Sequence, residues 1–127
     1  MRRLETRILI VEDNADTRYV LQHVLAIGGY ASVAASSGAE ALRHLRQGNQ
    51  VCAIILDLHL PDVDGRTLLR DLKADPAVAR IPVIVYSGDS GDVPPDAAAC
   101  VRKGTDDPDV LLGAIAACLN GTPPPSS

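Results

Sequence analysis

The chain has 127 residues, a formal net charge of −4 and 46% hydrophobic residues, with three Tyr and neither Phe nor Trp. This length fits one compact domain whose core is built from Leu, Ile, Val and Ala. The acidic balance and the scarcity of aromatic rings argue against a nucleic-acid binder, and no apolar run approaches the roughly 20 residues that cross a bilayer.

Short apolar runs alternate with segments of helical periodicity along the chain. The runs predict strands over residues 8–11, 31–35, 51–56, 82–86 and 99–102. The first run is apolar on both faces, as is typical of a buried parallel strand. Alternation of such strands with helices predicts an α/β fold, with a doubly wound parallel sheet between two layers of helices.

Four helices are indicated by capping residues and by apolar spacing. The residues expected to cap them are Asp13 or Asn14, then Ser37 in a capping box with Glu40, then Asp64, and finally Asp107 before Pro108. The side chains expected to face the sheet are Val20, Val24 and Ile27 in the first helix, Leu42 and Leu45 in the second, Leu68, Leu69 and Leu72 in the third, and Leu111, Ile115 and Cys118 in the last.

One segment interrupts this alternation. Residues 88–98 contain two Gly and two Pro and have room for about one helical turn, so we expect a shortened or irregular fourth helix there. We expect the folded domain to span residues 1–119, followed by a disordered Pro/Ser tail over residues 120–127.

Polar side chains follow four of the expected strands. They are Glu12 and Asp13 after the first, Asp57 after the third, Ser87 after the fourth and Lys103 after the fifth. Because ligands of open parallel sheets bind outside the carboxyl ends of the strands, these residues are expected to share one site. Clustered carboxylates repel one another unless a hard cation lies among them, which favours Mg²⁺. One carboxylate would then act as a nucleophile toward phosphorus, while Lys103 neutralises phosphoryl charge and Ser87 donates a hydrogen bond.

Each of these residues also has an ordinary structural interpretation. Asp57 would be a surface acid, Asp13 a helix cap near the positive end of the helix dipole, and Lys103 a solvated residue at a strand end. Ser87 before Gly88 would mark a turn. The occurrence of all of them at strand ends favours the functional interpretation.

Four motifs in this order and spacing resemble the receiver domain of two-component response regulators, the CheY-like family. They are I-L-I-V-E-D-N (8–14), I-I-L-D-L-H-L-P-D-V-D-G (54–65), V-I-V-Y-S-G (83–88) and V-R-K-G (101–104). The resemblance covers roughly residues 6–119 and implies a flavodoxin-like, five-stranded sheet in the order 2-1-3-4-5.

The resemblance also implies a role for each residue of the site. Asp57 would accept a phosphoryl group from a sensor histidine kinase or a histidine phosphotransfer protein. Mg²⁺ would be held by Glu12, Asp13, Asp57 and the main-chain carbonyl of His59. Ser87 would be the switch hydroxyl, and Lys103 would contact the phosphate.

Three features depart from the family pattern. Cys100, which we expect to be a small buried strand residue, occupies the position where the family usually has a switch aromatic. The family's frequent Lys-Pro is here Lys103-Gly104, and the fourth helix is short. These departures concern the response to phosphorylation rather than its chemistry.

We expect a single-domain response regulator without an output domain, which is not an enzyme in its own right but assists its own phosphotransfer. It would signal to an unknown downstream protein by phosphorylation-dependent binding, or relay the phosphoryl group. Three scattered cysteines and the lack of a signal-peptide core indicate a cytoplasmic location without membrane contact. The alternative is a receiver-fold interaction module with weak or no switching, while a hydrolytic phosphatase using Asp57 would lack a substrate cap.

Overall fold

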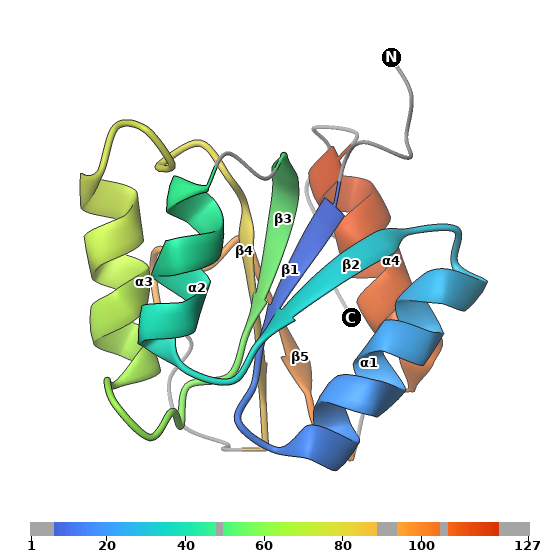
Figure 1. Cartoon of the computed structure of the whole chain (residues 1–127). Coiled ribbons are helices and arrows are strands. Elements are labelled where there is room, and N and C mark those ends of the chain that lie inside the picture. The colour runs from blue at the N-terminus through green and yellow to red at the C-terminus, as the bar shows by residue number, and fades with distance from the viewer. Residues whose placement is uncertain (1–6, 48–49, 89–93, 105–106, 120–127) are drawn as a thin grey trace.

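The structure, a computed structural model, describes residues 7–47, 50–88, 94–104 and 107–119. This part of the chain forms five strands and four helices (Figure 1). In chain order they are β1 (Arg7–Val11), α1 (Ala15–Ile27), β2 (Ala31–Ala35), α2 (Gly38–Arg46), β3 (Val51–Leu56), α3 (Gly65–Ala74), β4 (Val83–Ser87), β5 (Ala99–Arg102) and α4 (Pro108–Leu119). The predicted strands are confirmed, with shifts of a single residue at the ends of β1 and β4.

All five strands are parallel and lie in the order β2-β1-β3-β4-β5. This confirms the predicted doubly wound, flavodoxin-like sheet. Strand order reverses beside β1, and the carboxyl ends of β1, β3, β4 and β5 lie at one edge (Figure 1). The topology therefore places the polar residues that follow these strands near one another.

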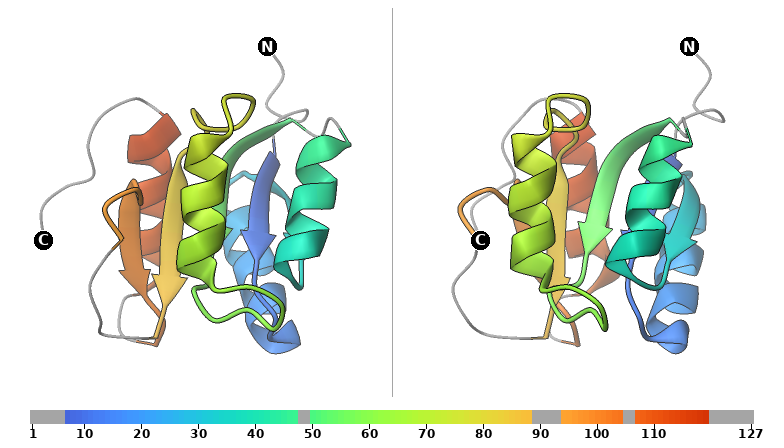
Figure 2. Two further views of the ribbon diagram at one scale, coloured as in Figure 1. Left: turned by 90° about the vertical axis from the view of Figure 1, so that its left-hand side faces the viewer. Right: turned by 60° about the vertical axis from the view of Figure 1, so that its left-hand side comes forward.

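The helices form a layer on each face of the sheet. Helices α1 and α4 cover one face, and α2 and α3 cover the other (Figure 2). Successive strand residues alternate between the two cores, so that Ile8 packs beneath α1 and α4 and Leu9 packs beneath α2 and α3. The largest fully buried side chains are aliphatic, with Glu12 as the one exception among the residues that the structure describes.

Local capping chemistry accounts for all four of the helix beginnings described. Asn14, not Asp13, caps α1, and its side chain accepts a hydrogen bond from the backbone N–H of Thr17 (2.9 Å). Ser37 caps α2 and Asp64 caps α3, as predicted. At α4, Oδ1 of Asp107 accepts hydrogen bonds from the backbone N–H groups of Asp109 (3.1 Å) and Val110 (3.3 Å), as predicted. In the described ranges, no helix is long and apolar enough to cross a membrane.

The predicted orientation of α1 is wrong. Val20 and Ile27, which were expected to face the sheet, are 53% and 72% exposed, whereas Leu21 and Leu25 are buried. The helix carries two apolar stripes of the same spacing, and the sheet buries the one that consists of leucines. The valine and isoleucine stripe, together with the exposed Tyr19, forms an apolar surface on α1.

The expectation that Cys100 is buried is also wrong. Cys100 is exposed on β5, the edge strand of the sheet, while its neighbour Val101 is buried beneath α1 and α4. Its side chain therefore belongs to the opposite face, and the described residues of the preceding connection, 88 and 94–98, form no helix that covers it. This agrees with the predicted irregular fourth helix, although residues 89–93 lie outside the described ranges.

The tail over residues 120–127 also lies outside the described ranges, so its expected disorder stays a prediction. The other two thiols, Cys52 and Cys118, are half-buried, and burial raises the pKa of both.

Candidate functional site

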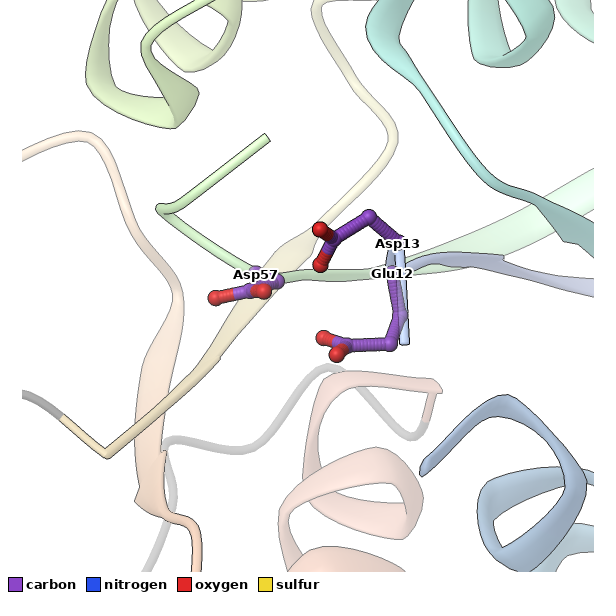
Figure 3. Close-up of side chains that lie close together, drawn as sticks. All are labelled: Glu12, Asp13 and Asp57. Atoms are coloured by element: carbon purple, nitrogen blue, oxygen red, sulfur yellow. The ribbon is translucent and has the colours of Figure 1, made fainter. Parts of the chain in front are cut away.

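Three carboxylates meet at the carboxyl edge of the sheet. Glu12 and Asp13 follow β1, and Asp57 follows the neighbouring strand β3 (Figure 3). One carboxylate oxygen from each lies within 4.8 Å of the others. Asp13 is exposed, but Glu12 and Asp57 are only 1% and 4% exposed. Two acids with so little access to water need positive charge nearby.

The turn between β1 and α1 orients the acid pair. Because Asn14 provides the helix cap, the carboxylate of Asp13 is not needed for that purpose. Arg18, one turn into α1, donates from Nη1 to the carbonyl oxygens of both Glu12 and Asp13, each at 2.9 Å. The sequence interpretation missed Arg18. Its spacing from the acid pair was the available signal, since a long side chain at that position can reach back to the turn.

Lys103 supplies positive charge to the cluster. Its Nζ donates to both carboxylate oxygens of Glu12, at 2.8 and 3.0 Å, and lies 3.4 Å from Oδ2 of Asp57. Partial burial lowers the pKa of Lys103, but its hydrogen bonds and charge interactions with Glu12 and Asp57 prevail and raise the pKa above its ordinary value. Lys103 is therefore charged and bridges the two buried acids.

One ammonium group does not balance the cluster. Burial and the adjacent Asp57 carboxyl together raise the pKa of Glu12 from its ordinary value of 4.5 to about 7, although Lys103 opposes the shift. The site therefore disfavours full ionisation of its acids when Lys103 is the only cation beside them. An oxygen-only donor set with this unmet demand for positive charge suits Mg²⁺, so the residues present fit this ion.

His59 was expected to contribute its main-chain carbonyl to that ion. Its backbone N–H donates to Oδ1 of Asp57 at 3.2 Å, and the residue pairs with Asp64 across the loop that follows β3. His59 is thus part of the loop beside the cluster. Ligation through its carbonyl stays a prediction.

Ser87 ends β4 and is 2% exposed. Its carbonyl oxygen accepts a hydrogen bond from the backbone N–H of Lys103 (3.1 Å), which joins the ends of β4 and β5. Gly104 follows with a φ of +73°, a left-handed conformation that glycine adopts without strain. The fold thus brings together the residues singled out in the sequence at the ends of four strands.

The loop between β3 and α3 folds back tightly on Asp57. A Cβ on Gly65 would lie 2.5 Å from Cα of Leu58 and 2.7 Å from the carbonyl oxygen of Asp57. The N–H of Gly65 donates to the carbonyl oxygen of Leu58 (2.9 Å), so the backbone leaves no room for a side chain.

Gly65→Ala should therefore lower the free energy of unfolding by about 1–3 kcal/mol, as overpacking against the backbone usually does. The measurement is urea unfolding. Gly113→Ala is the matched control, because nothing lies within 4 Å of an added Cβ at this position in α4. The free energy of unfolding of the control should rise by about 0.5–1 kcal/mol, because Ala has a higher helix propensity than Gly. Equal stability of the two variants would contradict the close approach at Gly65.

Asp62 ties the same loop to α2. Its two carboxylate oxygens accept hydrogen bonds from the backbone N–H groups of Gly38 (2.9 Å) and Ala39 (3.0 Å). These bonds lower the pKa of Asp62 below its ordinary value of 3.8. The sequence interpretation missed this contact, since it joins segments that are 24 residues apart.

Asp62→Ala should lower the melting temperature at neutral pH, because the first turn of α2 loses an acceptor. A lowered pKa means that the folded state favours the carboxylate. The stabilisation is therefore present above pH 3.8 and is lost as the pH falls through the lower pKa of the folded state. The difference in melting temperature between Asp62→Ala and the parent should therefore become smaller at acidic pH. The control is Asp71→Ala, at an exposed position in α3. If Asp62→Ala lowers the melting temperature no more than the control does, the contact of Asp62 with α2 does not stabilise the fold.

Comparison with known proteins agrees with this geometry. The family model described as response regulator receiver domain matches residues 8–108. The sensor kinase/phosphatase CqsS of Vibrio cholerae is 32% identical in an alignment of 123 residues that covers 91% of this chain and 18% of CqsS. A sensor protein from Polaromonas sp. JS666 has a similar structure, with a TM-score of 0.83, 28% identity, and coverage of 91% of this chain and 97% of that one.

The receiver domain of sensor histidine kinase PA1611 from Pseudomonas aeruginosa shares the fold, with a TM-score of 0.79 and 22% identity over 90% of this chain and 97% of that chain. That structure has a magnesium ion coordinated in its active site cleft. On the strength of the family match and the fold, the chain belongs to the response-regulator receiver domains of two-component signalling. This confirms the predicted resemblance. The chain spans less than a fifth of the length of CqsS, so what that whole protein does is not carried over.

Proposed function

We propose that this protein accepts a phosphoryl group on Asp57 from a sensor histidine kinase or a histidine phosphotransfer protein. The observation that carries the proposal is the position of the Asp57 carboxylate, which lies beside both a buried acid and an ammonium group at the edge where ligands of such sheets bind. An ordinary capping or surface aspartate would have neither neighbour.

Mg²⁺ would be held by Glu12, Asp13, Asp57 and the carbonyl of His59, and when bound it would neutralise charge on the phosphoryl oxygens. The three carboxylates already lie within bridging distance of one another. A magnesium ion in the cleft of the PA1611 receiver domain supports this choice of ion.

The protein's own residues would then act in the transfer. An oxygen of the Asp57 carboxylate forms the bond to phosphorus, and the bond from phosphorus to the donor's imidazole nitrogen breaks, with its electron pair remaining on nitrogen. The N–H of His59 donates a hydrogen bond to Oδ1 of Asp57 (3.2 Å). Lys103 lies 3.4 Å from Oδ2, close enough to pair with the negative charge of a phosphoryl group attached to Asp57. Ser87 would donate its hydroxyl to the phosphoryl group.

Phosphorylation would change binding to a downstream protein, or the group would be relayed to another phosphotransfer protein. On this proposal the protein would assist its own phosphotransfer and would not be an enzyme in its own right. Relatives that include a sensor kinase support kinases as partners. We expect the protein to act in the cytoplasm.

The test is incubation with phosphoramidate and Mg²⁺ followed by intact-mass measurement. A phosphoryl adduct is the expected result. If neither an adduct nor binding of beryllofluoride, a phosphoryl analogue, is detected, the proposal fails and the protein is an interaction module with a receiver fold. The exposed Cys100, at the position where the family usually has an aromatic side chain, would then support the interaction module.

A further inference from the structure

Tyr86 lies beside the site but has no part in the chemistry described above. It precedes Ser87 in β4 and is half-buried on the face of the sheet covered by α1 and α4. Its ring lines two adjoining hollows, one bounded by Val20 and Leu111 and the other by Lys103 and Gly104. The Nζ atom of Lys103 lies 5.8 Å from the centre of the ring.

This distance is within the range of a cation–π interaction. The ammonium group of Lys103 is held on one side by hydrogen bonds to Glu12 and by the charge of Asp57. The face of the Tyr86 ring also attracts the ammonium group electrostatically. Lys103 is therefore held between two acids and an aromatic face.

We propose that Tyr86 is a positioning residue that holds the Lys103 ammonium where it can reach a phosphoryl group on Asp57. This rests on the proposed function, since the position of Lys103 matters to the reaction only if Asp57 is phosphorylated. A ring face attracts a cation without a fixed donor–acceptor direction. Lys103 can thus turn from Glu12 toward phosphoryl oxygens without losing the contact, which a directional hydrogen bond would not permit.

The position of this ring differs from the position where the family usually carries its aromatic. Cys100 points to the face opposite that of Val101, whereas Tyr86 and Val101 share the face of α1 and α4. Tyr86 therefore acts on Lys103 from a different side of the sheet and does not replace the missing switch aromatic.

The test compares Tyr86→Leu, which removes the ring and keeps apolar volume, with Tyr86→Phe, which keeps the ring. The measured quantity is the rate of adduct formation with phosphoramidate and Mg²⁺. We expect Tyr86→Leu to lower this rate about two- to tenfold, the range that corresponds to loss of a cation–π contact. Tyr86→Phe keeps the ring and should react at the parent's rate. The control is Tyr30→Leu. Tyr30 is a half-buried tyrosine in the turn between α1 and β2, and its substitution should leave the rate unchanged.

A double-mutant cycle separates positioning from packing. In a Lys103→Ala background the Leu and Phe variants at position 86 should react at the same rate, because there is no ammonium left to hold. The same difference in both backgrounds would overturn the proposal and make Tyr86 a packing residue. Equal rates of the two variants with Lys103 present would also overturn it.

A second measurement needs no phosphorylation. The ε-methylene protons of Lys103 should show an upfield ring-current shift in the NMR spectrum of the parent and of Tyr86→Phe, and should lose it in Tyr86→Leu. Absence of this shift in the parent overturns the positioning role. If the shift is present but the parent forms no adduct, the proposed function fails while the contact between Tyr86 and Lys103 stands.

Discussion

Asp57→Asn is expected to abolish the phosphoryl adduct completely while the protein stays folded. A carboxamide oxygen is too poor a nucleophile to displace the donor, and no other carboxylate in the cluster has the position of Asp57 at the end of β3. Loss of one buried negative charge also relieves its repulsion with Glu12. The variant should therefore melt at the same temperature as the parent or above it.

The measurement is intact mass after incubation with phosphoramidate and Mg²⁺, alongside thermal unfolding. Asp71→Asn is the matched control, since this exposed aspartate lies on α3 away from the cluster, and it should form the adduct at the parent's rate. An adduct that persists in Asp57→Asn would show that another residue is the acceptor.

Lys103→Ala is expected to slow phosphorylation without preventing it, and to remove most of the conformational response to it. Mg²⁺ would still neutralise the phosphoryl oxygens, whereas the side chain that connects them to the end of β5 would be lost. The response is measured as the change in amide hydrogen exchange over residues 88–102 upon phosphorylation. An unchanged response in the variant would remove Lys103 from the switching mechanism.

The same substitution has a cost in stability. Without Lys103, the buried Glu12 and Asp57 lose their ammonium partner, and the expected loss at neutral pH is about 1–3 kcal/mol. Since Lys103 holds the pKa of Glu12 down, its removal raises that pKa further, and protonation of Glu12 makes the loss smaller at acidic pH. Lys73→Ala is the control. Its ammonium group donates to the carbonyl oxygens of Ala79 and Ile81, so this variant should lose stability but keep the response.

The sheet and most of the site were predictable from local sequence. Each strand is a short apolar run, and a parallel sheet places the carboxyl ends of its strands at one edge. Glu12, Asp57, Ser87 and Lys103 each end or follow such a run, so their convergence follows from the topology without knowledge of any long-range contact. The order of the strands came from the resemblance to the receiver family.

The errors and omissions have a common physical cause, which is packing between distant segments. Two apolar stripes on α1 have the same period, and only the sheet decides that Leu21 rather than Val20 is buried. The exposure of Cys100 depends on whether a neighbouring helix covers β5. The contacts of Asp62 with α2 and of Lys103 with the ring of Tyr86 likewise join segments that no local pattern relates.

The most direct test of the central claim is to locate the phosphoryl group on the parent protein. The chain is phosphorylated by phosphoramidate or by a phosphorylated histidine phosphotransfer protein, with and without Mg²⁺, and the adduct is mapped by peptide mass spectrometry. The account predicts a single adduct on the peptide that contains Asp57, formed only when Mg²⁺ is present. An adduct on a different residue, or one that forms equally well without Mg²⁺, would contradict it.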